Sequence, residues 1–468
     1  MVDKSVQKAV DKAQPAKFSH LHYIVKALIF HAFFLPTTVL VFPLYLLRAL
    51  LPHYSGKYKN WTWIEALGVF ITQRAMRNLI RFRMQPLPPR ENGWREMNNI
   101  LGSFLSLLNL TGPGGFVASP DPVLNQVSQY VRKGRRDRDW FEPPPLDALK
   151  GILSIKIDNN QVIDSQEYQG PALVEPKWAK TRIRGYWFMH NGIHSPTPGP
   201  KGSQKRSVIL YFHGGAAVTF AAGDVFMGQT LCKTISSKAQ MDLFSVDYNL
   251  APQAPFPVQI VQALAGYLHL INNYGYHPSQ IFFGGDSFGA WLALQLEHYL
   301  RTDGKHLIAN WDNKAPTASG VPGLLLISPW VCAHDVETPS RGMNGVGHRF
   351  DILLLSYGQW GLDAMQVGPK YHDRCPAPLD SPWLSPLCFS KEDFSVIPPS
   401  FVCVGSVEAL YDEDTQFVTE IQKAGGKVEL YVDDGGVHDY GTMSTFSSRF
   451  VKTCAAMHTW LNQVQSAM

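Results

Sequence analysis

The stretch from Ile281 to Leu300, IFFGGDSFGAWLALQLEHYL, decides the fold of this chain. Its first four residues form an apolar strand pattern, and its last eleven residues form a helical pattern. The pentapeptide between them, Gly285 to Gly289, matches G-x-S-x-G with Ser287 at its centre. A sharp strand-to-helix turn requires small flanking residues and exposes its serine at the carboxyl edge of the sheet. The pattern therefore predicts a nucleophile at Ser287; the alternative is an ordinary glycine-rich turn.

Short apolar runs alternate with helical patterns from Ser207 to the C-terminus. The runs are VILYFHGG, LFSVDYN, IFFGGDS, GLLLISPW, SFVCVGS and KVELYVDD. This alternation is typical of a mostly parallel sheet with helices on both faces. Two more strands are predicted upstream, at residues 152–162 and 181–189, and a glycine- and proline-rich loop at 191–205. The stretch GRRDRDW and the following prolines, Pro143 to Pro145, predict a surface loop.

A second glycine-rich turn, His213-Gly214-Gly215-Ala216, follows the strand that begins at Val208. Acyl transfer requires backbone N–H groups that are already aimed at the developing oxyanion, and glycine lets the backbone approach closely. We predict an oxyanion hole from Gly214, Gly215 and Ala216, completed by the amide of Phe288. The alternative is a phosphate-binding loop, but the turn has neither G-K-[ST] nor G-x-G-x-x-G.

A serine nucleophile needs a base and an acid that orients the base, and in this arrangement the chain order is serine, acid, histidine. His438 lies in the loop DGGVHDY after the strand 428–432, where the base is expected. The loop after the strand 401–405 offers four carboxylates: Glu408, Asp412, Glu413 and Asp414. The later three fall on the first turns of a predicted helix, where the helix dipole favours acids for structural reasons.

The motifs HGGA, DYNLAPQAPFP, GGDSFGA, LISPW, GSVEALYDED and GGVHDY together resemble the hormone-sensitive-lipase branch of the α/β hydrolases. The resemblance extends from Ser207 to the C-terminus and implies the α/β-hydrolase fold. The family's acid loop, approximately G-E-x-D-x-L-x-D, places its catalytic carboxylate on Glu408, and Asp412 is the reserve acid. With its apolar N-terminal segment, the chain also resembles the membrane-bound fungal steryl acetyl hydrolases.

This resemblance implies a serine carboxylic-ester hydrolase that needs no cofactor and forms an acyl-enzyme on Ser287. The implied substrate is a lipophilic ester, such as a sterol acetate. Phe288 stands where the family usually has alanine, so we expect a preference for short acyl groups. Two other interpretations stay open: an esterase or lipase for another lipophilic metabolite or lipid, and a catalytically inactive binding protein.

The composition restricts the remaining classes. The chain has 468 residues, of which 45% are hydrophobic and 17% charged, so a large core is possible. A net charge of +4 is small for this length and is not a nucleic-acid-binding signature. The six cysteines form no CxxC pair or other zinc pattern, and no metal site is expected. Cys403 lies in an apolar run and is expected to be a buried strand thiol.

Residues 27–47 carry no full charge and lie between Lys26 and Arg48. About 20 apolar residues in a helix cross the hydrocarbon core, so the segment predicts a membrane anchor with membrane lipid as its partner. A cleaved signal peptide, a buried helix and a helix along the membrane interface are the alternatives. Lysines before the segment favour a cytosolic N-terminus. We therefore expect a single-pass protein of the endoplasmic reticulum membrane with a lumenal catalytic domain.

The expected organisation has four parts. Residues 1–26 form an N-terminal tail, residues 27–47 the anchor helix, residues 48–150 a helical cap or membrane-proximal region, and residues 151–468 the catalytic domain. Amphipathic patterns between Trp61 and Leu110 predict helices, which either pack on the main domain or form a cap that covers the active site and touches the bilayer.

Overall fold

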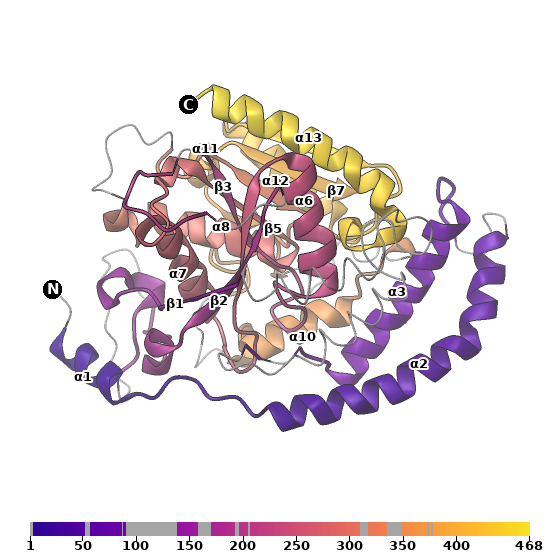
Figure 1. Ribbon diagram of the computed structural model, residues 1–468, viewed down its shortest axis with the longest axis horizontal. Helices are drawn as coiled ribbons and strands as arrows, with labels where there is room; N and C mark the ends of the chain where they lie inside the picture. Colours follow the sequence, from indigo (N-terminus) through magenta and orange to yellow (C-terminus); the bar gives the residue numbers. More distant parts are fainter. Residues whose placement is uncertain are drawn as a thin grey trace.

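The computed structural model describes residues 3–51, 57–86, 88–89, 138–157, 170–191, 196–204, 206–308, 317–334, 349–371, 375 and 378–468 (Figure 1). Nearly half of the predicted cap or membrane-proximal region, from residue 90 to residue 137, lies outside these residues. The described part contains one eight-stranded sheet in the order β1-β2-β4-β3-β5-β6-β7-β8. The strands are β1 (Arg138–Phe141), β2 (Ile183–Phe188), β3 (Val208–Phe212), β4 (Asp242–Asp247), β5 (Ile281–Asp286), β6 (Leu324–Ile327), β7 (Ser400–Gly405) and β8 (Val428–Asp433).

The sheet is parallel from β4 to β8, and β1 and β2 extend it with antiparallel pairs. Side chains alternate along each strand between two apolar clusters. In β3, for example, Leu210 joins the cluster on one face, whereas Ile209 and Tyr211 join the cluster on the other. The predicted parallel sheet is thus confirmed.

Helices cover both faces of this sheet (Figure 1). The cluster that contains Leu210 includes side chains of α7 (Val258–Asn272), α8 (Phe288–Arg301), α10 (Leu355–Met365) and α12 (Tyr411–Lys423). The cluster that contains Ile209 includes side chains of α6 (Lys233–Ala239), α13 (Ser447–Ser466) and the π-helical segment η6 (Val225–Cys232). The short helix α11 (Lys391–Val396) packs against α12. Cys403 is a fully buried thiol on β7, as predicted.

Two local predictions before β2 differ from the structure. Part of the predicted loop GRRDRDW is strand β1, because Asp139 finds donors inside the fold: Trp187 Nε1 at 3.0 Å and the Tyr274 hydroxyl at 2.5 Å. The start of the predicted strand 152–162 is instead a 3-10 turn, η4 (Gly151–Leu153), Ile155 forms an isolated parallel bridge with Val174, and residues 158–162 lie outside the described residues. The Asp303 carboxylate accepts the Ile152 N–H at 3.0 Å and so stabilises this turn.

Among the described residues, three helices precede the sheet: α1 (Lys4–Lys12), α2 (His20–Leu50) and α3 (Trp63–Phe82). Helix α3 begins with a capping box in which the Thr62 and Glu65 side chains each accept the other residue's backbone N–H. Helix α2 is 31 residues long with a mean hydropathy of 2.0 in its most apolar window, which makes it long and apolar enough to cross a membrane. In Figure 1, α3 lies between α2 and the rest of the molecule.

Candidate active site

Ser287 lies in the tight turn between β5 and α8, as the sequence predicts. Its backbone has φ 52° and ψ −119°, a conformation that costs a non-glycine residue about 1–3 kcal/mol. The turn approaches its neighbours so closely that a Cβ on Gly289 would lie 2.0 Å from the Phe212 carbonyl oxygen. A Cβ on Gly285 would likewise lie 2.3 Å from the Gly289 backbone. Both glycines of G-x-S-x-G are therefore required by close packing.

His438 is the nearest base to this serine. It follows β8, and its Nε2 lies 2.9 Å from Ser287 Oγ. Both side chains are almost buried, with 6% of Ser287 and 5% of His438 exposed. An imidazole nitrogen at this distance can accept the hydroxyl proton as the oxygen attacks an electrophile.

Glu408 faces the other ring nitrogen of His438. Its Oε1 lies 3.9 Å from His438 Nδ1, an ion-pair distance longer than a hydrogen bond. Neither of these two atoms has a hydrogen-bond partner among the described residues. The second oxygen, Oε2, accepts the Gly405 N–H at 2.8 Å and the Ser328 hydroxyl at 2.7 Å. The carboxylate is thus held in place by one oxygen and turned toward the histidine with the other.

The reserve acid, Asp412, has a different position. It lies on the first turn of α12, and its side chain is exposed to solvent. The structure therefore brings together Ser287, His438 and Glu408 and leaves Asp412 on the surface. Asp414, two residues later, is fully buried. Burial, assisted by the negative charge of Glu408, raises the pKa of Asp414 well above its usual range.

The predicted oxyanion hole needs one correction. The Gly214 N–H donates to Asp286 Oδ2 at 2.9 Å, so this amide is not available to an oxyanion. The amides of Gly215, Ala216 and Phe288, in contrast, donate to no protein acceptor within the described part of the chain. Three of the four predicted residues thus retain an available N–H beside the nucleophile.

Asp286 connects the two turns that carry these groups. Besides the Gly214 amide, it accepts the Tyr211 hydroxyl at 2.9 Å. The carboxyl is fully buried, and burial raises its pKa to about 6 although both hydrogen bonds act in the opposite direction. The G-x-S-x-G motif marks Asp286 in the sequence, but no local pattern indicates that it binds the Gly214 amide in the other turn.

Asp351 was missed by sequence reasoning. One of its oxygens accepts the His438 N–H at 2.7 Å, and the other accepts the Ala409 N–H at 2.8 Å. One buried carboxyl therefore holds both the loop of the base and the loop of the acid. Burial raises its pKa to about 6. No local motif marks this residue, because its partners lie 58 and 87 residues away.

Asp439 also lies beside the base, with Oδ2 3.3 Å from His438 Nε2. Burial lowers the pKa of His438, but the carboxylates of Asp439, Glu408 and Asp351 outweigh it and raise the pKa to about 10. Burial raises the pKa of Asp439 well above its usual range, although the charge of His438 lowers it. The imidazole of His438 and the carboxyl of Asp439 therefore titrate as a coupled pair.

The ring of Phe288 is fully buried in an aromatic cluster. It stacks on Trp291 with ring centroids 4.7 Å apart and lies 6.0 Å from Tyr248 and 6.3 Å from Trp330. Trp330 also contacts the nucleophile's backbone, because the backbone N–H of Trp330 donates to the Ser287 carbonyl at 3.1 Å.

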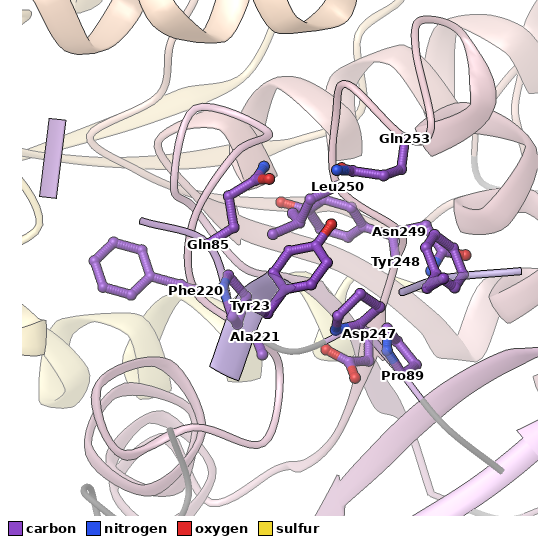
Figure 2. A pocket seen from close by; sticks show the side chains of 13 residues that line it. Tyr23, Gln85, Pro89, Phe220, Ala221, Asp247, Tyr248, Asn249, Leu250 and Gln253 are labelled. Carbon is purple, nitrogen blue, oxygen red and sulfur yellow. The ribbon is translucent and has the colours of Figure 1, made fainter. Parts of the chain in front are cut away.

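Figure 2 shows a narrow pocket of about 20 Å³ between the N-terminal helices and the loops after β3 and β4. Tyr23 of α2 and Gln85 line one side, and Phe220 and Tyr248 line the other. Ser287, His438 and Glu408 are not among its lining residues. Tyr248 nevertheless connects this pocket to the site. Its hydroxyl donates at 2.6 Å to the carbonyl of His213, the first residue of the predicted oxyanion turn.

No group of three or more histidine, cysteine, aspartate or glutamate side chains suited to a metal ion occurs among the residues with described positions. The chemistry that these residues can perform is proton transfer and nucleophilic attack.

A protein-family model described as the alpha/beta hydrolase fold matches residues 209–442, half of the chain. An esterase of Acinetobacter venetianus is 29% identical over 228 residues, which cover 49% of this chain and 65% of that protein. An acetyl-hydrolase of Streptomyces hygroscopicus is 26% identical over 227 residues, which cover 48% of this chain and 65% of that protein. This chain therefore spans slightly less than two thirds of the length of each relative.

Among solved structures, a thermostable esterase from Pseudomonas putida ECU1011 has a TM-score of 0.47 and 20% sequence identity to this chain. The superposition covers 61% of this chain and 79% of that one.

Proposed function

This chain belongs to the α/β-hydrolase fold family, and from that premise we propose that it is a carboxylic ester hydrolase with Ser287 as nucleophile. The observation that carries the proposal is the 2.9 Å contact between Ser287 Oγ and His438 Nε2. Relatives named esterase and acetyl-hydrolase support the same reaction class.

In the first proposed step, His438 takes the hydroxyl proton of Ser287 as Oγ attacks the ester carbonyl. The charge that develops on the imidazole is stabilised by Glu408, which faces Nδ1. The carbonyl oxygen becomes an oxyanion and accepts hydrogen bonds from the amides of Gly215, Ala216 and Phe288. Collapse of this intermediate expels the alcohol, which receives the proton from His438, and leaves an acyl group on Ser287.

In the second step, water replaces the alcohol. His438 removes a proton from the water as its oxygen attacks the acyl-enzyme, and the same amides stabilise the second oxyanion. The carboxylic acid then leaves and Ser287 regains its proton. Asp286 and Asp351 touch no reacting atom in this scheme; they position the oxyanion turn and the two catalytic loops, respectively.

We extend the proposal to short-chain esters, such as acetates, of lipophilic alcohols that include sterols. The short-acyl preference rests on Phe288, which stands next to Ser287 where the family usually has alanine; its ring is fully buried and stacks on Trp291. The exposed apolar surface of α2 supports a substrate that dissolves in lipid.

The test is a hydrolysis screen with the full-length protein and a matched Ser287→Ala variant. Substrates are p-nitrophenyl esters from acetate to dodecanoate and acetylated sterols. We expect hydrolysis by the wild type alone, with acetate or butyrate faster than dodecanoate. Labelling by a fluorophosphonate probe provides a second readout of a reactive Ser287. A wild-type protein that neither hydrolyses any ester nor reacts with the probe would show that the site is inactive, and faster dodecanoate hydrolysis would contradict the short-acyl preference.

A further inference from the structure

Helix α2 carries most of the exposed apolar surface in the described residues. Of 19 large hydrophobic side chains that are exposed there, 12 lie on α2. The most exposed are Leu40 at 77%, Val39 at 72% and Leu21 at 71%. A contiguous apolar surface of this kind marks a contact with another molecule or with a membrane.

The opposite side of α2 packs along α3. Near one end of the contact, the Lys26 ammonium donates to the Arg83 carbonyl at 3.3 Å. In the middle, the Arg74 guanidinium donates to the Thr37 and Thr38 hydroxyls at 2.6 and 3.1 Å. A helix that crossed the hydrocarbon core alone would have to break these hydrogen bonds, and one that crossed together with α3 would carry the charge of Arg74 into the core.

Helix α3 is in turn fixed to the catalytic domain. The Gln73 amide donates to the Asp351 carbonyl at 2.9 Å, and the Arg449 guanidinium forms an ion pair of 2.6 Å with Glu65. The Trp61 indole N–H donates to the Gly435 carbonyl at 2.6 Å, close to the loop of His438. Helix α2 is therefore attached to the catalytic domain through α3.

The segment before α2 is attached to the same domain. Val6 and Val10 of α1 are buried in the main apolar cluster, next to the short helix η5 (Pro176–Lys180). The Ala16 N–H donates to the Thr181 hydroxyl at 3.0 Å. Figure 1 shows α1, the linking segment and α2 along one side of the molecule. A helix that spans a membrane separates its two ends by ~30 Å of hydrocarbon, whereas both flanks of α2 contact one domain.

The charges around α2 have one sign. From Lys12 to Gln85 the chain has ten lysines and arginines but one acid, Glu65, which is paired with Arg449. Arg77 and Arg81 are exposed on α3, and Arg48 is exposed near the end of α2. Basic side chains beside an exposed apolar helix face are complementary to the anionic headgroups of a lipid bilayer.

We propose that α2 lies in the plane of a lipid bilayer rather than across it. Its exposed face enters the acyl chains of one leaflet, the neighbouring arginines contact anionic headgroups, and residues 3–19 stay on the same side as the catalytic domain. This membrane surface stands independently of the esterase activity.

Topology gives the first test. The full-length chain, with one epitope tag at each end, is synthesised in the presence of microsomes, and the intact vesicles are treated with protease. An in-plane helix leaves both tags on one side, so both are cleaved or both are protected. Protection of one tag alone would show that α2 spans the bilayer and would overturn the proposal.

Binding gives the second test, which needs no activity. Full-length protein is sedimented with vesicles of phosphatidylcholine, or of equal parts phosphatidylcholine and phosphatidylserine. We expect stronger binding with phosphatidylserine, and a loss of roughly tenfold or more in the Leu40→Glu/Leu44→Glu variant, because charged side chains are costly in hydrocarbon. The matched control is Val396→Glu, an exposed apolar position on α11 that should bind like the wild type.

Thermal unfolding of both variants verifies that they fold. Arg77→Gln/Arg81→Gln should reduce the advantage of phosphatidylserine and leave binding to phosphatidylcholine unchanged. Binding of the Leu40→Glu/Leu44→Glu variant at the wild-type level, or equal binding of the wild type to the two kinds of vesicle, would contradict the proposal.

Discussion

Soluble proteins usually bury apolar side chains and expose charged ones. The catalytic edge of the sheet and helix α2 each depart from this distribution, but in different ways. The catalytic edge buries carboxyl groups: Asp286, Asp351, Glu408, Asp414 and Asp439 are all at most 6% exposed. Helix α2 instead exposes leucine and valine to solvent. Each arrangement is unfavourable in water on its own, so each indicates a function that other parts of the chain do not have.

The two regions differ in how specific their contacts are. At the catalytic edge, individual donors hold individual oxygens, as the Gly405 amide and the Ser328 hydroxyl hold Glu408. On the outer face of α2, side chains such as Leu40 and Val39 are apolar and cannot form hydrogen bonds, so no single polar contact holds them. Single substitutions should therefore have large effects at the catalytic edge, whereas the α2 face should respond to the summed loss of apolar area.

The largest effect is expected at the nucleophile. Ser287→Ala removes the only proposed oxygen that can form the acyl-enzyme, so kcat/KM for p-nitrophenyl acetate should fall roughly 10⁴- to 10⁶-fold. Thermal unfolding should show a folded variant, because the change removes one oxygen. Activity at a few per cent of the wild type would show that Ser287 is not the nucleophile.

The acid should come next. Glu408→Gln keeps the shape and removes the charge that faces His438, so kcat should fall roughly 10²- to 10⁴-fold. The matched control is Asp412→Asn on the exposed first turn of α12, and we expect its kcat to stay near that of the wild type. A large loss in the Asp412 variant with a silent Glu408 variant would reverse the assignment of the acid.

A smaller loss is expected for the positioning residue Asp351. In Asp351→Asn only one oxygen remains to accept the His438 and Ala409 amides, so one catalytic loop should shift. Because small displacements of catalytic groups reduce the rate strongly, we expect kcat to fall about 10- to 100-fold with little change in KM. Asp363→Asn, at an exposed position on α10, is the control and should leave kcat unchanged. Equal kcat values for the two variants would mean that the site does not depend on this carboxyl.

The smallest effect is a shift in pH dependence. Catalysis needs neutral His438, and the raised pKa of this group means that activity is gained as pH rises through that pKa and lost below it. Asp439→Asn removes a charge that raises this pKa, so the midpoint of the kcat/KM profile should move to lower pH, with similar rates at high pH. An unchanged midpoint would show that Asp439 does not hold the proton together with His438.

Local patterns predicted the parts of the molecule whose chemistry is local in sequence. The six strand patterns from β3 to β8, the turn around Ser287 and the long helix around residues 27–47 all follow from neighbouring residues. The position of Glu408 came from the family motif. Asp351 could not be found in this way, because its two hydrogen bonds join segments distant in sequence. The use of the Gly214 amide by Asp286 likewise depends on how closely β3 and β5 pair.

Strand β1 and helix α2 illustrate the same limit. The sequence RDW alone predicts a solvated loop. In the structure Trp187 and Tyr274 donate to Asp139, and the segment is strand β1. The composition of α2 is equally suited to crossing a bilayer and to lying along it, so the orientation that we propose rests on the contacts of α1 and α3.

The ion pair between Glu65 and Arg449 joins residues 384 positions apart. At ordinary rates of translation, several hundred residues take on the order of tens of seconds to synthesise. Helix α2 therefore leaves the ribosome long before the C-terminal surface that holds α3 exists. During that interval the apolar side chains of α2 need a chaperone or a lipid surface to cover them. The exposed face of α2 needs a similar cover in the folded protein.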